Sequence, residues 1–429
     1  WDKRRLYCDN DACGQRTFAE TGPVAERGAR VSVTGRETMG HLVGDWLVPV
    51  RRVADALGSS WHTAQDALDR LAELAGITVT LPADADADAM DAVGGAGVGK
   101  PLVVGPDDDY GGAGGAGVRR SRRSVSGPRP GVGVLGIDDH RRGRPRYHQD
   151  PVSGRWVADA DRWATGLFDA TGGHGLLGVV EGRTVAGTVD WLAAQPEEWL
   201  AGIWAVTIDM STTYASAARE ALPHALLAID GFHVSQLANK AIGDTRRRVT
   251  HELRGRRGRA TDPEYTIRGL LVRAEEKLSP AARGKLLCTL ADLGGNAALA
   301  IGTAWRAKEH LRAVLALSPT RSGLATCRTD IDRALTRFFE YAATTGATVP
   351  EVVTLAETVS RWREEIANAV LHGLSNATAE GVNRLIKLVY RTAFGLTNIV
   401  HQQTRARYVA SRATRPAWPL PVTTTTSTA

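Results

Sequence analysis

Two short apolar runs, each followed by an aspartate, limit most strongly what this chain can fold into. Residues 132–137 precede Asp138, and residues 203–208 precede Asp209. Short apolar runs of this kind predict buried strands. In open α/β sheets, ligand-binding side chains gather at the carboxyl ends of such strands. The two aspartates are therefore the first candidates for a shared site.

The pattern from residue 132 alternates between strand and helix and then becomes helical. Strands are predicted near 132–138, 162–169, 174–180, 203–209 and 225–230, with helices near 184–193, 212–221 and 232–245. This order predicts a mixed α/β sheet flanked by helices. Residues 240–370 lack strand-like alternation and are predicted to be an all-α insertion, so that 131–239 and 371–412 form the two parts of one catalytic domain.

A third acidic residue, Glu380, begins an amphipathic helix that Ser375 or Asn376 caps. A cationic series follows Glu380 at spacings of four, three and four residues, which aligns its members with Glu380 on one helix face. The series consists of Arg384, Lys387 and Arg391. We expect Glu380 to be a metal ligand and the three basic side chains behind it to form a rail that binds DNA. A solvated face with internal ion pairs is the alternative.

The three carboxylates together predict two-metal chemistry. Phosphodiester cleavage needs charge neutralised on both the attacking and the leaving oxygen, and two Mg²⁺ or Mn²⁺ ions held by carboxylates supply this. Asp138 is preferred over Asp139, which points to the opposite face if the pleat continues. A single aspartate at a strand end is more often a turn or helix cap. The set of Asp138, Asp209 and Glu380 is the stronger signal.

Basic residues cluster directly after the predicted sheet. The chain has 429 residues and a net charge of +6, which permits a polyanionic partner without requiring one. Seven arginines fall within fourteen residues: Arg246, Arg247, Arg248, Arg254, Arg256, Arg257 and Arg259. They predict a phosphate track, with a solvated helix as the alternative. Just before them, Asp230 and His233 are expected to support the site through a hydrogen bond or a DNA contact.

Residues 1–35 contain Cys8 and Cys13 beside a Gly turn with basic flanks. This resembles half of a zinc ribbon, but tetrahedral Zn²⁺ needs four ligands. Two unrelated free cysteines are the alternative. Since the chain begins with Trp1 and not Met, we expect a fragment that lacks its true N-terminus, where the missing ligands would lie.

Residues 36–79 predict a helix-turn-helix, with the turn at 58–60. Trp61, His62 and Gln65 would then read base edges from the second helix. A generic helical hairpin is the alternative. Residues 80–130 are rich in Gly, Ala and Asp and predict a flexible linker, and the tail 413–429 is expected to be disordered.

The remaining cysteines, Cys288 and Cys327, are expected to be buried thiols in a reducing, intracellular setting. No segment has the apolar length of a membrane span, so no membrane partner is expected.

The motifs resemble the DDE transposases of bacterial insertion sequences, in particular the family called ISL-three. The resemblance rests on the runs 136–139, 208–211, 228–234 and 375–387. It implies an RNase H-like catalytic domain with a helical insertion before the Glu, preceded by a zinc ribbon and a helix-turn-helix. It further implies that Asp138, Asp209 and Glu380 form the metal-binding triad, and that Asp230 and His233 form an Asp-x-x-His element. The upstream half of the zinc ribbon is absent, and the loop between Asp138 and the second strand is longer than a minimal hairpin requires.

The resemblance predicts a transposase that cleaves element ends and joins them to target DNA. Its expected partners are double-stranded terminal repeats and target DNA, bound by a homodimer, in the bacterial cytoplasm at the nucleoid. Two alternatives stay open: a structure-specific nuclease or resolvase on the same fold, and a DNA-binding regulator with a relic catalytic domain.

Overall fold

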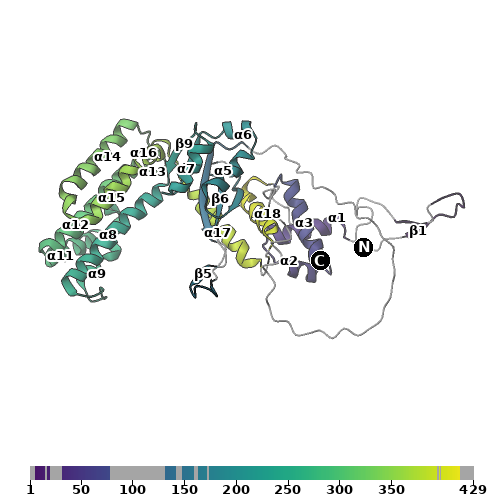
Figure 1. Ribbon diagram of the computed structural model, residues 1–429, viewed down its shortest axis with the longest axis horizontal. Coiled ribbons are helices and arrows are strands. Elements are labelled where there is room, and N and C mark those ends of the chain that lie inside the picture. The colour runs from purple at the N-terminus through teal and green to yellow at the C-terminus, as the bar shows by residue number, and fades with distance from the viewer. Residues whose placement is uncertain are drawn as a thin grey trace, which may run out of the picture. The chain divides into compact units, whose positions relative to one another are not determined.

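The computed structural model describes residues 5–14, 17–19, 31–77, 131–141, 147–158, 163–171, 173–393, 396 and 398–415 (Figure 1). The chain forms two compact units, one from 1–130 together with 383–429 and the other from 131–382. The predicted linker 80–130 and most of the predicted tail lie outside the described residues. In the described part of the chain, no helix is both long and apolar enough to cross a membrane.

The first unit contains a small hairpin and a helical bundle. Strands β1 (Arg5–Tyr7) and β2 (Thr17–Ala19) pair antiparallel. The bundle consists of α1 (Val33–Gly44), α2 (Val50–Ala56), α3 (Trp61–Leu74) and α18 (Ile399–Ala410), and the short helix η4 (Arg412–Thr414) follows α18. Ser32, Ser60 and Asn398 begin their helices by accepting a backbone N–H three residues on, as N-cap residues do.

Helix α18 completes the core of this bundle, which corrects its predicted place in the catalytic domain. The Tyr408 ring is buried with Val43 and Leu68. It packs so closely that a side chain on Gly44 would collide with it. Arg415 donates to Asp45 Oδ1 at 2.8 Å and lies over the Tyr408 ring. The apolar surface that α18 covers is formed by α1–α3, more than 300 residues earlier in the chain, and so could not be recognised from the local sequence.

The second unit is built on a five-stranded mixed sheet, as predicted. The strands are β3 (Val134–Arg141), β6 (Trp163–Asp169), β7 (Leu176–Glu181), β8 (Ala205–Ile208) and β9 (Leu226–Ile229). Their order is β7-β6-β3-β8-β9, with β3, β6 and β7 antiparallel and β3, β8 and β9 parallel. Each strand lies within three residues of its predicted range, because buried strands produce apolar runs that can be recognised locally.

Strand β3 does not end at Asp138, contrary to the prediction. Its parallel pairing with β8 stops at Ile137, but its antiparallel pairing with β6 continues to Arg141. The backbone of β6 satisfies the hydrogen bonds of the additional residues. A second hairpin, β4 (Tyr147–Gln149) and β5 (Trp156–Ala158), follows between β3 and β6.

Helices α5 (Val185–Ala193), α6 (Glu197–Ala201) and α7 (Thr212–Ala221) follow the sheet strands, and α8 (Gly231–Arg254) leads into the insertion. Helix α8 is longer than the predicted 232–245 because its buried face continues through Val249. It ends at Gly255, whose φ of 61° suits a residue without a side chain.

The insertion is helical, as predicted, and its helices gather on one side of the sheet (Figure 1). They are α9 (Pro263–Thr266), α10 (Arg268–Leu271), η2 (Glu275–Lys277), α11 (Pro280–Leu293), α12 (Gly295–Ala316), α13 (Pro319–Ser322), α14 (Arg328–Ala343), η3 (Thr345–Thr348), α15 (Pro350–Arg361) and α16 (Arg363–His372). Leu311, Phe338 and Ile366 contribute to its core. Cys288 and Cys327 are exposed, so the prediction of buried thiols is wrong: neither lies on the apolar face of its segment.

Candidate active site

Asp138 and Asp209 lie side by side on adjacent parallel strands. Gly136 and Thr207 are register partners in β3 and β8, and the two aspartates come two residues after them. Since side chains alternate between sheet faces, Asp138 and Asp209 extend from the same face as Gly136 and Thr207. Burial, followed by the negative charge of Asp209, raises the pKa of Asp138 to about 7. The site therefore concentrates negative charge.

His233, at the start of α8, is the partner of Asp209. Its Nε2 lies 2.9 Å from Asp209 Oδ1, and this contact raises the pKa of the imidazole. Asp230 caps the helix by accepting the Phe232 N–H at 3.2 Å, which fixes the turn that carries His233. Burial raises the pKa of Asp230. Of the roles predicted for this pair, the geometry favours ordering the site through a hydrogen bond.

Asn376 attaches the Glu380 helix, α17 (Ala377–Thr392), to the sheet. Its side-chain Nδ2 donates to the Ile137 carbonyl at 3.4 Å, and its Oδ1 accepts from Thr207 Oγ1 at 3.3 Å. A Cβ on Gly136 would lie 2.7 Å from the same Oδ1. The residue that the sequence predicted as a helix cap thus uses its side chain to bind two strands, and its backbone carbonyl accepts the Glu380 N–H at 3.2 Å.

These contacts hold the start of the Glu380 helix against the strands that lead to Asp138 and Asp209. Gly136, Thr207 and Asn376 are in mutual contact. Asp138 and Asp209 are two residues further along their strands, on the same face. Glu380 is one helical turn beyond Asn376, on the same side of α17, where its side chain is exposed. The structure therefore brings Asp138, Asp209 and the start of the Glu380 helix together from distant parts of the chain.

The donor chemistry of this site fits a hard divalent cation. Within the described ranges, no group of three His, Cys, Asp or Glu side chains forms a complete metal-binding set. Carboxylate oxygens are nevertheless the ligands that Mg²⁺ and Mn²⁺ prefer. Apart from its contact with His233, the buried Asp209 Oδ1 accepts no hydrogen bond from a described group. A cation would also relieve the repulsion that raises the pKa of Asp138.

Asp139 faces a different environment, as its position in the pleat predicted. Its carboxylate lies 3.7 Å from Arg183, and burial raises its pKa. Nearby, the hydroxyl of Tyr214 is hydrogen-bonded to Thr165 Oγ1 at 3.1 Å, and burial raises the pKa of that tyrosine well above its usual value. Arg141 and Arg183 both lie over the Trp163 ring, at 4.8 and 4.1 Å from its centre. The sequence analysis missed Arg183 and Tyr214, which no local motif marks.

The predicted zinc ligands lie at the hairpin turn of the first unit. Cys8 directly follows β1, and the Cys13 N–H donates to the Asn10 carbonyl at 3.0 Å. Both side chains are half-buried. No third His, Cys, Asp or Glu joins them among the residues with described positions.

The predicted base-reading residues differ in accessibility. His62 is exposed and Trp61 is half-buried, with its ring edge-on to His401 at 5.7 Å. Gln65 is only 1% exposed and its Nε2 donates to Asp69 at 2.9 Å, so it cannot reach a base edge as placed. The prediction for Gln65 is wrong because the second turn of α3 faces the bundle core.

Most of the predicted phosphate track is engaged in ion pairs within the protein. Three of its arginines form bidentate ion pairs: Arg248 with Glu351, Arg254 with Glu264, and Arg256 with Asp262. Arg247 pairs with Asp244. Arg246 is buried and lies 5.5 Å from the centre of the Tyr265 ring. Five of the seven arginines predicted to form a phosphate track are thus engaged within the protein.

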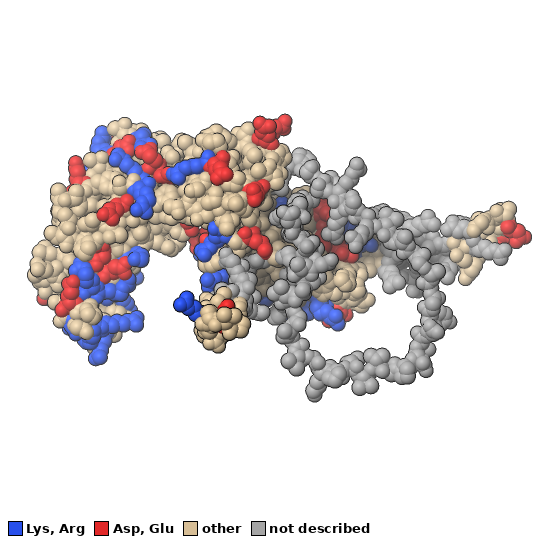
Figure 2. Space-filling view, in the orientation of Figure 1, with Lys and Arg blue, Asp and Glu red and all other residues tan. Residues whose placement is uncertain are grey.

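Arg257 and Arg259 are exposed, and in the part of the chain that the structure describes neither guanidinium pairs with a carboxylate. Figure 2 shows Lys and Arg gathered around the outer end of α8 and α9. The predicted rail on α17, formed by Arg384, Lys387 and Arg391, is exposed, and Val382, Ile386 and Val389 are buried on its other side.

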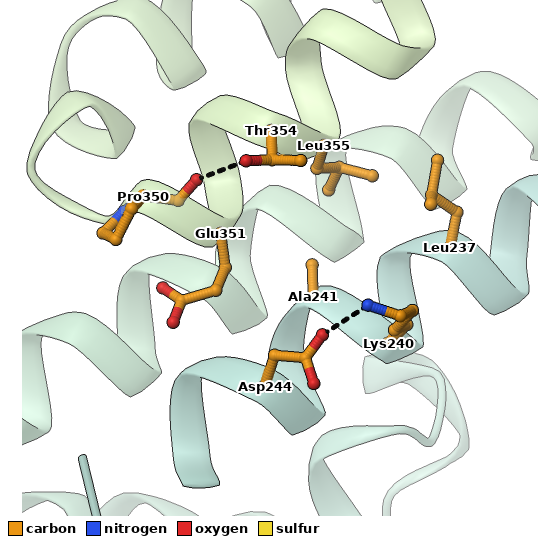
Figure 3. A pocket seen from close by; sticks show the side chains of 8 residues that line it. All are labelled: Leu237, Lys240, Ala241, Asp244, Pro350, Glu351, Thr354 and Leu355. Carbon is orange, nitrogen blue, oxygen red and sulfur yellow. Dashed lines mark hydrogen bonds and ion pairs between the residues drawn. The ribbon is translucent and has the colours of Figure 1, made fainter. Parts of the chain in front are cut away.

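A cavity of about 230 Å³ lies between α8 and α15 and contains none of the predicted catalytic residues (Figure 3). Its charged groups are already paired, Lys240 with Asp244 at 2.7 Å and Glu351 with Arg248. It therefore offers no unpaired group for chemistry.

Comparisons with known proteins identify a family for this chain. The sequence profile of the ISL3 (ISL-three) DDE family, described as a transposase family, matches residues 135–406. Two curated relatives are similar: the transposase for insertion sequence element IS1557 from Mycobacterium tuberculosis strain CDC 1551 / Oshkosh, and the same protein from strain ATCC 25618 / H37Rv. Each is 28% identical over 248 residues, 54% of this chain and 53% of the relative. The chain thus spans about half the length of these relatives. No solved structure matches.

Proposed function

The chain belongs to the ISL3 family of DDE transposases, and we propose that it cleaves DNA at the ends of an insertion sequence and joins them to target DNA. Water would hydrolyse a phosphodiester at the element end and leave a 3′-hydroxyl, which then attacks a target phosphodiester. The contact of Gly136, Thr207 and Asn376 carries this proposal, because it supports convergence of Asp138, Asp209 and Glu380.

Asp138, Asp209 and Glu380 would hold two Mg²⁺ or Mn²⁺ ions, which neutralise the charge on the attacking and leaving oxygens when bound. His233 would keep the Asp209 carboxylate in one orientation, and Asn376 would hold the helix of Glu380 against the sheet. The antiparallel β7-β6-β3 arrangement followed by the parallel β8 and β9 supports an RNase H-like fold for this unit.

The first unit would recognise the terminal repeats. Helices α2 and α3 support a helix-turn-helix in which Trp61 and His62 contact DNA. Cys8 and Cys13 would supply half of a zinc ribbon in a longer protein. Since an element has two ends, a homodimer on DNA would provide two active sites.

The proposed reaction can be tested with a plasmid that carries the insertion element and its flanks, incubated with purified protein and Mg²⁺ or Mn²⁺. We expect free 3′-hydroxyls at the element ends, followed by products joined to a second plasmid. Cleavage without joining would favour the nuclease or resolvase alternative. Specific binding without either product would favour the regulator.

The exposed arginines beyond α8 are expected to bind DNA, and the paired ones to stabilise the fold. Arg257→Ala should weaken DNA binding a few-fold for all sequences and reduce the slope of log affinity against log salt by roughly one, as loss of one phosphate contact does. Anisotropy titrations at several salt concentrations measure both quantities.

Arg254→Ala is the matched control, because its guanidinium bonds Glu264 at 2.6 and 3.0 Å. The melting temperature should fall, since the buried Glu264 loses its partner, while the salt slope stays close to that of the wild type. Equal effects of both variants on the slope would contradict this division of roles.

A further inference from the structure

The hairpin of β4 and β5 is an additional arm on the catalytic sheet. It lies between β3, which carries Asp138, and β6, where a short turn would suffice. Tyr147 pairs with Ala158, and Gln149 pairs with Trp156. Its tip is ordered by Asp150, whose Oδ1 accepts the N–H groups of Val152 and Ser153 at 2.9 and 2.6 Å. In Figure 1 the arm, labelled β5, extends away from the sheet.

Large apolar side chains on this arm are exposed. Trp156 is 70% exposed, Tyr147 is 56% exposed and Val152, at the tip, is 95% exposed. Tyr147 and Trp156 are diagonal neighbours on one face of the hairpin, within reach of the same flat ligand. A two-stranded hairpin is marginally stable by itself, and exposed aromatic clusters mark interaction sites. This face therefore fits a binding partner.

The charge of the arm indicates what that partner is. The connection between β3 and β6, residues 142–162, contains five arginines and three acidic residues, and so has a net positive charge: Arg142, Arg144, Arg146, Arg155 and Arg162 against Asp150, Asp159 and Asp161. Arg141 and Arg183 at the base of the arm lie over Trp163. Aromatic rings among arginines match a ligand with flat π faces and a phosphate backbone.

We propose that the β4–β5 arm binds DNA where bases are unpaired, with Trp156 and Tyr147 stacking on an exposed base beside the active site. Bases inside a duplex are already stacked on both faces, so an aromatic side chain gains a partner only where the duplex ends or opens. The proposal rests on the proposed function, since the arm departs from the strand of Asp138, where the DNA end would be cut and joined.

The test uses two fluorescent probes of equal length and sequence: a blunt duplex and a fork with five unpaired nucleotides on each strand. Binding is measured by anisotropy with the full chain in Ca²⁺ at fixed salt, so that the readout does not depend on cleavage. We expect the wild type to prefer the fork. Trp156→Ala should weaken fork binding about tenfold, as loss of base stacking does, with less than a twofold effect on the blunt duplex.

Two variants serve as controls. Trp156→Phe keeps a stacking ring and should bind the fork nearly as the wild type does. Trp204→Ala removes a partly exposed tryptophan that precedes β8, at the strand end opposite Asp209, and should leave the preference for the fork unchanged. Because Trp156 is exposed, the melting temperature of Trp156→Ala should equal that of the wild type.

The outcomes separate this proposal from the proposed reaction. A wild type without fork preference, or a Trp156→Ala variant that loses equal affinity for both probes, would overturn the arm proposal; the second result would indicate a β-ribbon in a duplex groove. The protein could also prefer the fork through Trp156 and yet give no cleavage products. That result would support the proposal for the arm and contradict the proposed reaction.

Discussion

Asp209→Asn should abolish both cleavage and strand transfer, with a loss on the order of 10³-fold or more, because in the proposed mechanism its charge holds metal ions that supply several kcal/mol of transition-state stabilisation. Asparagine has nearly the same volume, so the fold should persist. It removes the negative charge from the oxygen that faces His233 and offers a cation a weaker ligand. The measurement is the rate of 3′-hydroxyl formation at saturating DNA, with and without Mg²⁺.

Asp139→Asn is the matched control for this experiment, since it makes the same change one residue from Asp138 on the other face of β3. This variant loses its charge contact with Arg183, so its melting temperature should fall. Its cleavage rate should stay close to that of the wild type. DNA binding by Asp209→Asn in Ca²⁺ should stay within about twofold of the wild type. If Asp209→Asn cleaved DNA at the wild-type rate, the proposed site would be wrong and the regulator alternative would gain.

Asn376→Leu should reduce the cleavage rate by about 10²-fold by displacing the helix that carries Glu380, because a shift of about 1 Å in a catalytic group can cost that much. Leucine fills similar space but cannot donate to the Ile137 carbonyl or accept from Thr207. The unfolding free energy should fall by about 1–3 kcal/mol from the unpaired polar groups. Asn376 would thus be a positioning residue, and the Mg²⁺ concentration for half-maximal rate should rise while DNA affinity stays unchanged.

Asn368→Leu provides the control, because Asn368 in α16 also donates to a strand carbonyl, that of Leu227 at 3.0 Å. Its loss should lower stability without changing the Mg²⁺ requirement. Gly136→Ala should reproduce the Asn376→Leu phenotype, since its Cβ would lie 2.7 Å from Asn376 Oδ1. A rate per folded molecule equal to wild type in Asn376→Leu would show that the contact is structural only.

Some features of the fold and site follow from local sequence patterns. The strands that precede Asp138 and Asp209 were located because buried strands are short apolar runs. The helix of Glu380 was recognised from its amphipathic period, and Val382, Ile386 and Val389 are buried as that period requires. The acidic residues were candidates because Asp138 and Asp209 follow apolar runs in the sequence and Glu380 opens an amphipathic pattern.

Other features depend on partners that are distant in the sequence. Arg254 and Arg257 are both arginines of one basic cluster, but only Arg254 meets a buried glutamate when the chain turns after α8. Gln65 matches the pattern of a base reader in the sequence, but its side chain is buried in the bundle core. The exposed aromatic face of the β4–β5 arm was invisible in the sequence, which showed only a long loop.

The sequence by itself determined the main strands and helices, their order and the candidate acidic residues, because hydrophobic period and capping act between near neighbours along the chain. Only the tertiary structure decided that Asn376 joins the Glu380 helix to the strands of Asp138 and Asp209, and that α18 completes the bundle of α1–α3. The physical reason is that buried hydrogen bonds and core contacts form between surfaces that meet only after the chain has folded.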